Sequence, residues 1–197
     1  MSEKATQKTL ARTMYAVIAA IVCMSSTSYA AVAEAPTKVV KIKSVGGLSK
    51  SLVKSAQKYL PASQRPAPKG LKARGKWVKE ILHEAGFRGK KLESAWAIVM
   101  KESTGWPKAY NGNRATGDSS YGLFQINMIG NLGPDRREIF GIKSNKELFD
   151  PLTNAKAAYH MSNGGKNWYS WDIDSNGYNG GQARGAYLSW IKKYPEG

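Results

Sequence analysis

The sequence of 197 residues predicts one mainly α-helical domain with a loop-rich centre, preceded by a signal peptide and a basic linker. Three observations lead to this prediction. Apolar residues recur at helical spacing after residue 71, a Gly-, Asn- and Ser-rich segment follows at 105–120, and no section is rich in β-strand patterns. We expect residues 1–30 to be the signal, 31–70 the linker and 71–197 the domain.

Residues 1–30 have the pattern of an export signal. Lys4, Lys8 and Arg12 form a positive start, residues 15–23 form a short apolar core, and Ser28-Tyr-Ala30 is a small-residue cleavage pattern. The apolar run is shorter than the roughly 20 residues of a membrane-spanning helix. We therefore expect a protein exported to the periplasm or the cell exterior, with an uncleaved membrane anchor as the alternative.

Positive charge is concentrated in the linker and the start of the domain. The formal net charge is +16, and residues 38–91 hold fifteen Lys or Arg against only Glu80 and Glu84. Such a field concentrates polyanions, so anionic envelope polymers are candidate partners of the 38–76 tract, with a solvated tether as the alternative. The tract lacks the interleaved aromatic residues of a nucleic-acid-binding surface. We expect no specific nucleic acid partner, and a monomer.

Two helices open the expected domain. Trp77, Ile81 and Leu82 recur at helical spacing in the first helix, which we expect to end near Gly86. The second helix runs from about Lys90 to Lys101, and apolar residues surround most of it, which is typical of a buried helix.

Two further helices are expected in the second half of the domain. One covers Leu152–Tyr159 after the pair Asp150-Pro151, with Asp150 or Thr153 as its cap. The other covers about Gln182–Tyr194 and closes the chain. A short helix around Leu48–Leu60 is expected within the linker.

The sequence predicts no metal and no cofactor. Cys23 is the only cysteine, and the only histidines, His83 and His160, are far apart, so zinc-type spacing is missing. Residues 172–177 match the first half of a calcium-binding EF-hand loop. Ala183 stands where that loop requires a bidentate glutamate, so we expect a turn instead.

Glu102 closes the second helix and is the candidate catalytic acid. It follows Ile98 and Val99 by four and three residues, so it continues the apolar face of the helix. Desolvation disfavours the charged form of a carboxyl, and a departing glycosidic oxygen needs a carboxyl that is still protonated. The alternative is a solvated glutamate at a frayed helix end.

The surroundings of Glu102 resemble the signature of the lysozyme-like superfamily of soluble lytic transglycosylases and goose-type lysozymes. In that family a helix ends in Glu-Ser, and a Gly-Leu-Met/Phe-Gln segment follows some twenty residues later. The matching blocks here are Ala97–Ser103, Gly117–Asn127 and the later block Phe149–Tyr159. The later block, followed by Trp168 and Trp171, looks most like a subgroup common in phage particles and phage lysins, and the resemblance covers about Trp77 to Trp190.

The resemblance implies a lysozyme-like helical domain with a loop-rich substrate cleft that cleaves the MurNAc-GlcNAc β-1,4 bond of peptidoglycan. Glu102 corresponds to the catalytic acid. The resemblance also implies an exported or a phage virion- or lysis-associated protein, and these substrate-binding residues: Ser103, Tyr121, Gln125, Asn127, Asn154, Tyr159 and Trp168. Core packing is the alternative for Tyr159 and for at least one of Trp168 and Trp171.

A second carboxylate decides between two reactions. A direct hydrolase needs one, and Asp118 is the candidate, with a local turn as the alternative role. Asn127 stands where goose-type relatives carry an aspartate. Without a second carboxylate, Glu102 can act as acid and then as base on the 6-hydroxyl of muramic acid, which gives a 1,6-anhydro product. We expect this lytic transglycosylase; the alternatives are a hydrolytic lysozyme (endolysin or virion-associated) and a non-catalytic cell-wall-binding module.

Overall fold

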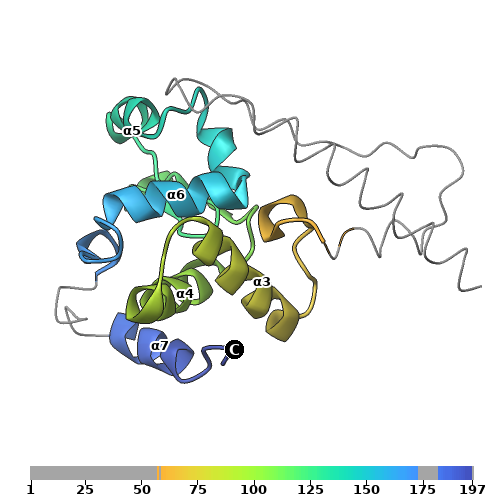
Figure 1. Cartoon of the computed structure of the whole chain (residues 1–197). Helices are drawn as coiled ribbons and strands as arrows, with labels where there is room; N and C mark the ends of the chain where they lie inside the picture. Colours follow the sequence, from red (N-terminus) through yellow and green to blue (C-terminus); the bar gives the residue numbers. More distant parts are fainter. Residues whose placement is uncertain (1–56, 58, 173–181, 197) are drawn as a thin grey trace, which may run out of the picture. The chain divides into compact units, whose positions relative to one another are not determined.

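The computed structural model describes residues 57, 59–172 and 182–196, all within one compact unit, Lys43–Gly197. These residues form five α-helices and three very short strands (Figure 1), so the mainly α-helical prediction is confirmed. The expected signal peptide and the helix expected around 48–60 lie outside the described residues, apart from the last few residues of that helix. Within the described part, no helix has the length and apolar character that crossing a membrane requires.

The elements follow one another along the chain with short connections. The strands β1 (Tyr110–Asn111), β2 (Ser120–Tyr121) and β3 (Ile126–Asn127) form one antiparallel sheet in the order β1-β2-β3. The helices are α3 (Leu71–Glu84), α4 (Gly89–Ser103), α5 (Leu132–Phe140), α6 (Pro151–Met161) and α7 (Gln182–Ile191). Short 3-10 helices precede and connect them: η1 (Ala62–Gln64), η2 (Arg114–Thr116), η3 (Asn145–Phe149) and η4 (Tyr169–Trp171).

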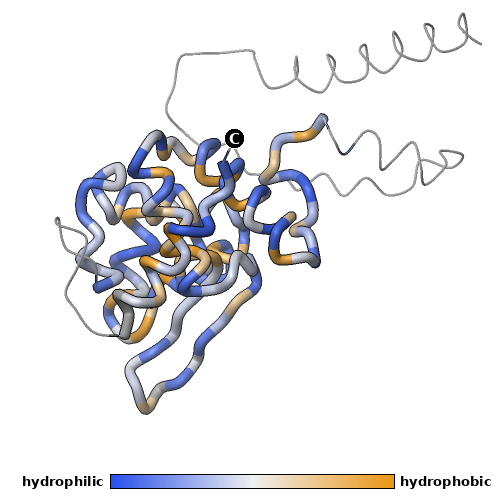
Figure 2. The backbone as a smooth tube through the Cα atoms, turned by 90° about the horizontal axis from the view of Figure 1, so that it is seen from below, coloured by the Kyte–Doolittle hydropathy of each residue, from blue (hydrophilic) through white to orange (hydrophobic). Residues whose placement is uncertain are grey.

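Helix α4 is the central element of the core. Its residues 95–100 are all buried, as the apolar residues around the helix predicted, and it packs against both α3 and α7 (Figure 1). Figure 2 shows the apolar stretches of the backbone gathered where the helices pack, with mainly hydrophilic loops outside. Removal of this apolar surface from water is the main term that holds α4 in place, and α4 in turn carries Glu102.

The last residues of the expected linker belong to the domain. Ala62 is 1% exposed, and its carbonyl accepts a hydrogen bond of 2.8 Å from Trp77 Nε1. The buried guanidinium of Arg74 donates to the carbonyls of Pro68 (3.2 Å) and Lys69 (2.7 Å). The turn-rich segment from Pro61 to Lys69, at the end of the expected linker, therefore packs onto α3.

Helix α5 was not predicted from the sequence. Gly133 is its only buried residue, so it shows no apolar periodicity. The signals that were present are Pro134 in the first turn and Gly141, which ends the helix with a φ of 64°. In α6, by contrast, Asp150 is the cap: its side chain accepts the Thr153 N–H at 2.8 Å.

Candidate active site

Glu102 lies in the last turn of α4, just before the chain reverses. Thr104 adopts a left-handed conformation with a φ of 50°, and Gly105 follows with a φ of 78°. A Cβ on Gly105 would lie 2.9 Å from Val78 Cγ2, so this close turn requires glycine. The reversal leaves Glu102 at the edge of the core.

The Glu102 side chain is 23% exposed, and Lys101 Nζ donates to its Oε1 at 2.7 Å. The sequence predicted that Glu102 continues the apolar face of the helix, with a solvated glutamate as the alternative. In the structure it lies one turn beyond the buried Ile98 and Val99, where Lys101 and solvent reach it. The carboxyl is thus accessible to a ligand.

Ser103 joins the end of α4 to the second family block. Its Oγ donates to the Leu123 carbonyl at 2.7 Å, lies 3.1 Å from the Val99 carbonyl and accepts the Gly105 N–H at 3.2 Å. Ser103 is 8% exposed. It therefore fixes the position of the Leu123 segment beside Glu102, and its hydroxyl has three partners within the protein.

The Gly-Leu-Phe-Gln segment is a tight turn between β2 and β3. Gly122 has a φ of 73°, and a Cβ there would lie 2.2 Å from the Leu148 carbonyl. Gln125 also has a positive φ, 48°, and its Nε2 donates to the carbonyls of Ala109 (3.1 Å) and Gly122 (3.0 Å). The half-buried Gln125 amide therefore supports the turn.

Asn154 holds the same turn from α6. Its Nδ2 donates to the carbonyls of Tyr121 and Leu148, both at 2.9 Å, and its Oδ1 accepts the Phe124 N–H at 2.9 Å. It is 0% exposed. A side chain without exposed surface cannot contact a sugar, so the expected substrate-binding role of Asn154 is corrected to one of positioning.

The two tryptophans after α6 belong to the core. Trp168 is 5% exposed and stacks on Phe87 and Phe124, with ring centroids 5.8 and 6.3 Å apart. Trp171 is 6% exposed and donates from Nε1 to the Phe124 carbonyl at 2.8 Å. The expected sugar contact of Trp168 is therefore also corrected, in favour of the packing alternative.

Tyr159 is far from Glu102 along the direction of α4. Its partly exposed ring lies edge-on to Phe87, 5.0 Å between centroids, and against Gly86 and Gly164. Phe87 precedes α4, whereas Glu102 lies in its last turn, a separation of about 20 Å at 1.5 Å per helical residue. The contacts of Tyr159 are thus those of the packing alternative.

Asp118, the candidate second carboxylate, is held by contacts within its own loop. Asp118 Oδ2 accepts from the Thr116 hydroxyl at 2.7 Å, and its Oδ1 lies 3.3 Å from the Ser120 hydroxyl. These contacts match the local-turn alternative that the sequence left open for Asp118.

Asn127 closes the loop from β3. Its Oδ1 accepts the N–H groups of Ser119 (3.1 Å) and Ile129 (3.0 Å), and its Nδ2 donates to the Gly117 carbonyl at 2.8 Å. Each polar atom of the amide is therefore used within the protein.

Tyr121 is the centre of an aromatic cluster that sequence reasoning missed in part. Its ring lies 4.9 Å from that of Tyr110, its partner across β1 and β2, and 5.3 Å from Phe149. A hydrogen bond with Ser119 lowers the pKa of Tyr121, and the positive charge of Lys146 acts in the same direction. Strands of two residues leave no alternation in the sequence, so Tyr110 gave no signal.

No group of three or more His, Cys, Asp or Glu side chains gathers as a metal site within residues 57, 59–172 and 182–196. The half calcium loop lies outside the described residues except for Asp172, which has a φ of 57°.

The fold is mainly helical, and an accessible glutamate ends its central helix. A turn that the buried Asn154 supports lies beside this glutamate. These features are those of a lysozyme-like domain. Residues 79–173 match the model of a family described as a lysozyme like domain. This match supports the resemblance to the lysozyme-like superfamily that the sequence showed. No curated protein and no solved structure matches the chain. A lysozyme-like domain implies a glycosidase-type enzyme whose substrate is peptidoglycan.

Proposed function

We propose that Glu102 is the general acid of a lytic transglycosylase that cleaves the MurNAc-GlcNAc β-1,4 bond. The observation that carries the proposal is the place of this carboxyl. It is 23% exposed at the end of α4, and the neighbouring Ser103 bonds to Leu123 at 2.7 Å, within the matched domain. A carboxyl on a firmly held helix end is suited to proton transfer, which depends on geometry first.

In the proposed reaction Glu102 donates its proton to the glycosidic oxygen as the bond from muramic acid C1 to that oxygen breaks. Lys101 donates to Oε1, which leaves Oε2 for the transfer. The 6-hydroxyl of the same muramic acid then bonds to C1, and its proton returns to Glu102. No water is consumed, and the product carries a 1,6-anhydro ring.

The contacts of the two neighbouring polar residues favour this route over hydrolysis. A hydrolase needs a second carboxylate to activate water or to stabilise the cation. Both oxygens of Asp118 lie beside hydroxyls of its own loop, and Asn127 carries an amide, which is a poor base. An intramolecular hydroxyl also avoids the entropy of capturing a water molecule.

Mass spectrometry of purified sacculi after digestion tests the proposed reaction. We expect anhydromuropeptides as the main product, and we expect the Asp118→Asn variant to digest at close to the wild-type rate. Reducing-end muramic acid as the main product, with a large loss in Asp118→Asn, would make the protein a hydrolytic lysozyme. An absence of released glycan fragments would make it a wall-binding module.

We further propose that the enzyme works outside the cytoplasm, through export by residues 1–30 or as part of a phage lysis system or virion. Its proposed substrate lies outside the cytoplasmic membrane, and the sequence of residues 1–30 has the charge, apolar core and small-residue end of a signal. N-terminal sequencing of the protein from an exporting host should find cleavage after Ala30 or Ala33. A full-length protein retained in the membrane fraction would show an uncleaved anchor.

A further inference from the structure

An aromatic and basic patch lies where β1 and β2 meet η3. It consists of Lys108, Tyr110, Tyr121, Lys146 and Phe149, and we call it the tyrosine patch. Tyr110 is 55% exposed, although its ring packs against Tyr121 at 4.9 Å. Phe149 continues the cluster at 5.3 Å from Tyr121. The patch thus presents one open aromatic ring on a base of two half-buried rings.

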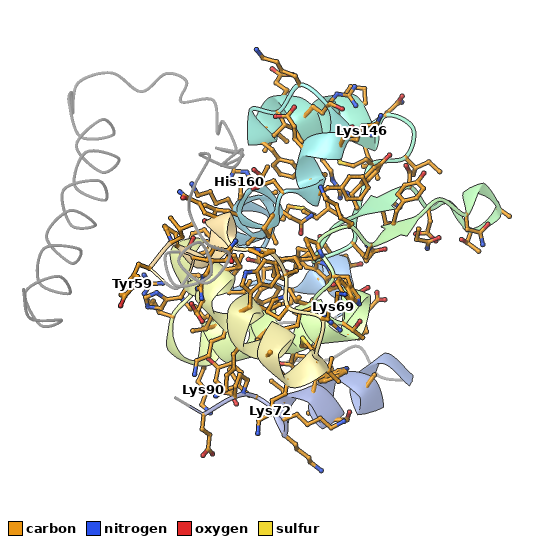
Figure 3. All side chains as sticks on the ribbon, turned by 90° about the vertical axis from the view of Figure 1, so that its right-hand side faces the viewer. Tyr59, Lys69, Lys72, Lys90, Lys146 and His160 are labelled. Carbon is orange, nitrogen blue, oxygen red and sulfur yellow. The ribbon has the colours of Figure 1, made fainter. Side chains whose placement is uncertain are left out.

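Both lysines of the patch are exposed, and neither has an ion-pair partner among the described residues. Lys108 Nζ lies 5.3 Å above the Phe149 ring, and Lys146 shares η3 with Phe149. In Figure 3, Lys146 lies far from Lys72 and Lys90, on the other side of the domain. Its charge is therefore separate from those of Lys72 and Lys90.

The carboxylates nearest in sequence form no ion pair with the two lysines among the described residues. Glu147 Oε1 accepts the N–H groups of Lys143 (2.7 Å) and Ser144 (2.8 Å). Asp150 caps α6, and Asp118 contacts the hydroxyls of its own loop. The three carboxylates thus have other partners, and both lysine ammonium groups are available to an acidic ligand.

The patch is joined to the candidate acid by a short path. Tyr121 immediately precedes the turn Gly122–Gln125, and Leu123 in that turn accepts the hydrogen bond of Ser103, the neighbour of Glu102. A glycan strand bound at Glu102 extends over several sugars, so a residue two positions before Leu123 can contact one of them.

We infer that the tyrosine patch is a subsite for an N-acetylmuramic acid unit and its acidic substituent. The inference rests on the proposed function. The exposed part of the Tyr110 ring packs on the apolar face of the sugar ring. Lys108 and Lys146 bind the carboxylate of the lactyl group or of the peptide attached to it, which only muramic acid carries in the alternating strand. The patch thereby selects peptidoglycan over a neutral chitin strand.

Binding of two soluble ligands to the full chain tests the inference. One ligand is a neutral chitin oligosaccharide, and the other is a peptidoglycan fragment with the same number of sugars and with free carboxylates. Both are titrated against a Glu102→Gln background to prevent turnover. We expect Lys108→Gln/Lys146→Gln to lose about three- to tenfold in affinity for the acidic fragment, and to bind the neutral one as before. Lys156→Gln/Lys166→Gln, two exposed lysines elsewhere, is the matched control.

Tyr110→Ala should weaken both ligands, whereas Tyr110→Phe should bind both as the unmodified background does, because stacking needs only the ring. Equal losses of affinity in the Lys108→Gln/Lys146→Gln variant and in the control double variant would overturn the inference. Equal losses for the two ligands in Lys108→Gln/Lys146→Gln would also overturn it. If the unmodified background binds neither ligand, the proposed function fails together with the subsite. Thermal melting of each variant shows whether it is folded.

Discussion

Asn154→Ala should destabilise the domain strongly, although Asn154 contacts no ligand in our account. The asparagine side chain is 0% exposed and satisfies three backbone groups: the Phe124 N–H and the carbonyls of Tyr121 and Leu148, each at 2.9 Å. Alanine leaves all three groups without this partner, in a space too enclosed for the chain to find another easily.

The size of the effect follows from these three groups. A buried polar group that loses its partner costs about 1–3 kcal/mol, and a carbonyl with a second lone pair lies at the low end of that range. We therefore expect Asn154→Ala to lower the free energy of unfolding by about 4 kcal/mol. For a domain of this size that corresponds to a fall in Tm of roughly 10–15 °C.

Urea unfolding at fixed pH measures this difference directly. Asn131→Ala is the control, because Asn131 is exposed and its side chain makes no capping hydrogen bond to α5. A loss below about 1 kcal/mol in Asn154→Ala, the net value of one ordinary hydrogen bond, would refute the reasoning that this amide holds the Gly122–Gln125 turn.

Two further predictions concern the glycine of the turn and the start of the domain. Gly122→Ala should lower the free energy of unfolding by about 3 kcal/mol or more, because its φ is 73° and a Cβ would lie 2.2 Å from the Leu148 carbonyl. Gly117→Ala is the control, because Gly117 has a similar φ of 74° but open space around it. Equal losses in the two variants would contradict the steric explanation. A chain that begins at residue 57 should unfold like the full chain, whereas one that begins at residue 70 should lose about 3 kcal/mol, because Trp77 and Arg74 lose their carbonyl partners; equal midpoints would show that this segment contributes nothing. The chain that begins at residue 57 lacks the basic tract 31–56, so it should bind sacculi more weakly than the full chain at low salt. Equal binding of the two chains across a salt titration would make that tract only a tether.

Helices α3, α4 and α6 could be predicted because each has a local signal. The apolar residues around α4, the pair Asp150-Pro151 before α6 and Gly86 after α3 all act within a few residues along the chain. Helix α5 lacks a buried face, so its end signals alone remained.

The candidate site could be predicted in part, because long-range contacts decide what each residue does. The Glu-Ser helix end and the Gly-Leu-Phe-Gln segment were singled out from the sequence, and the Ser103–Leu123 hydrogen bond of 2.7 Å joins them. The burial of Asn154 and Trp168 depends on contacts with Phe124, thirty and more residues away, which no spacing in the sequence reveals. Tyr110 escaped notice because its two-residue strand leaves no alternation in the sequence.

The central claim is that Glu102 is the catalytic acid, and one comparison tests it most directly. Glu93 lies on the same helix, its side chain is also 23% exposed, and it also pairs with a lysine, Lys90, at 3.1 Å. Glu93→Gln and Glu102→Gln therefore remove the same charge from similar surroundings. Release of soluble fragments from purified sacculi should fall by about 10²- to 10⁴-fold in Glu102→Gln, with an unchanged Tm, and by less than about twofold in Glu93→Gln. Similar rates for the two variants would contradict the claim.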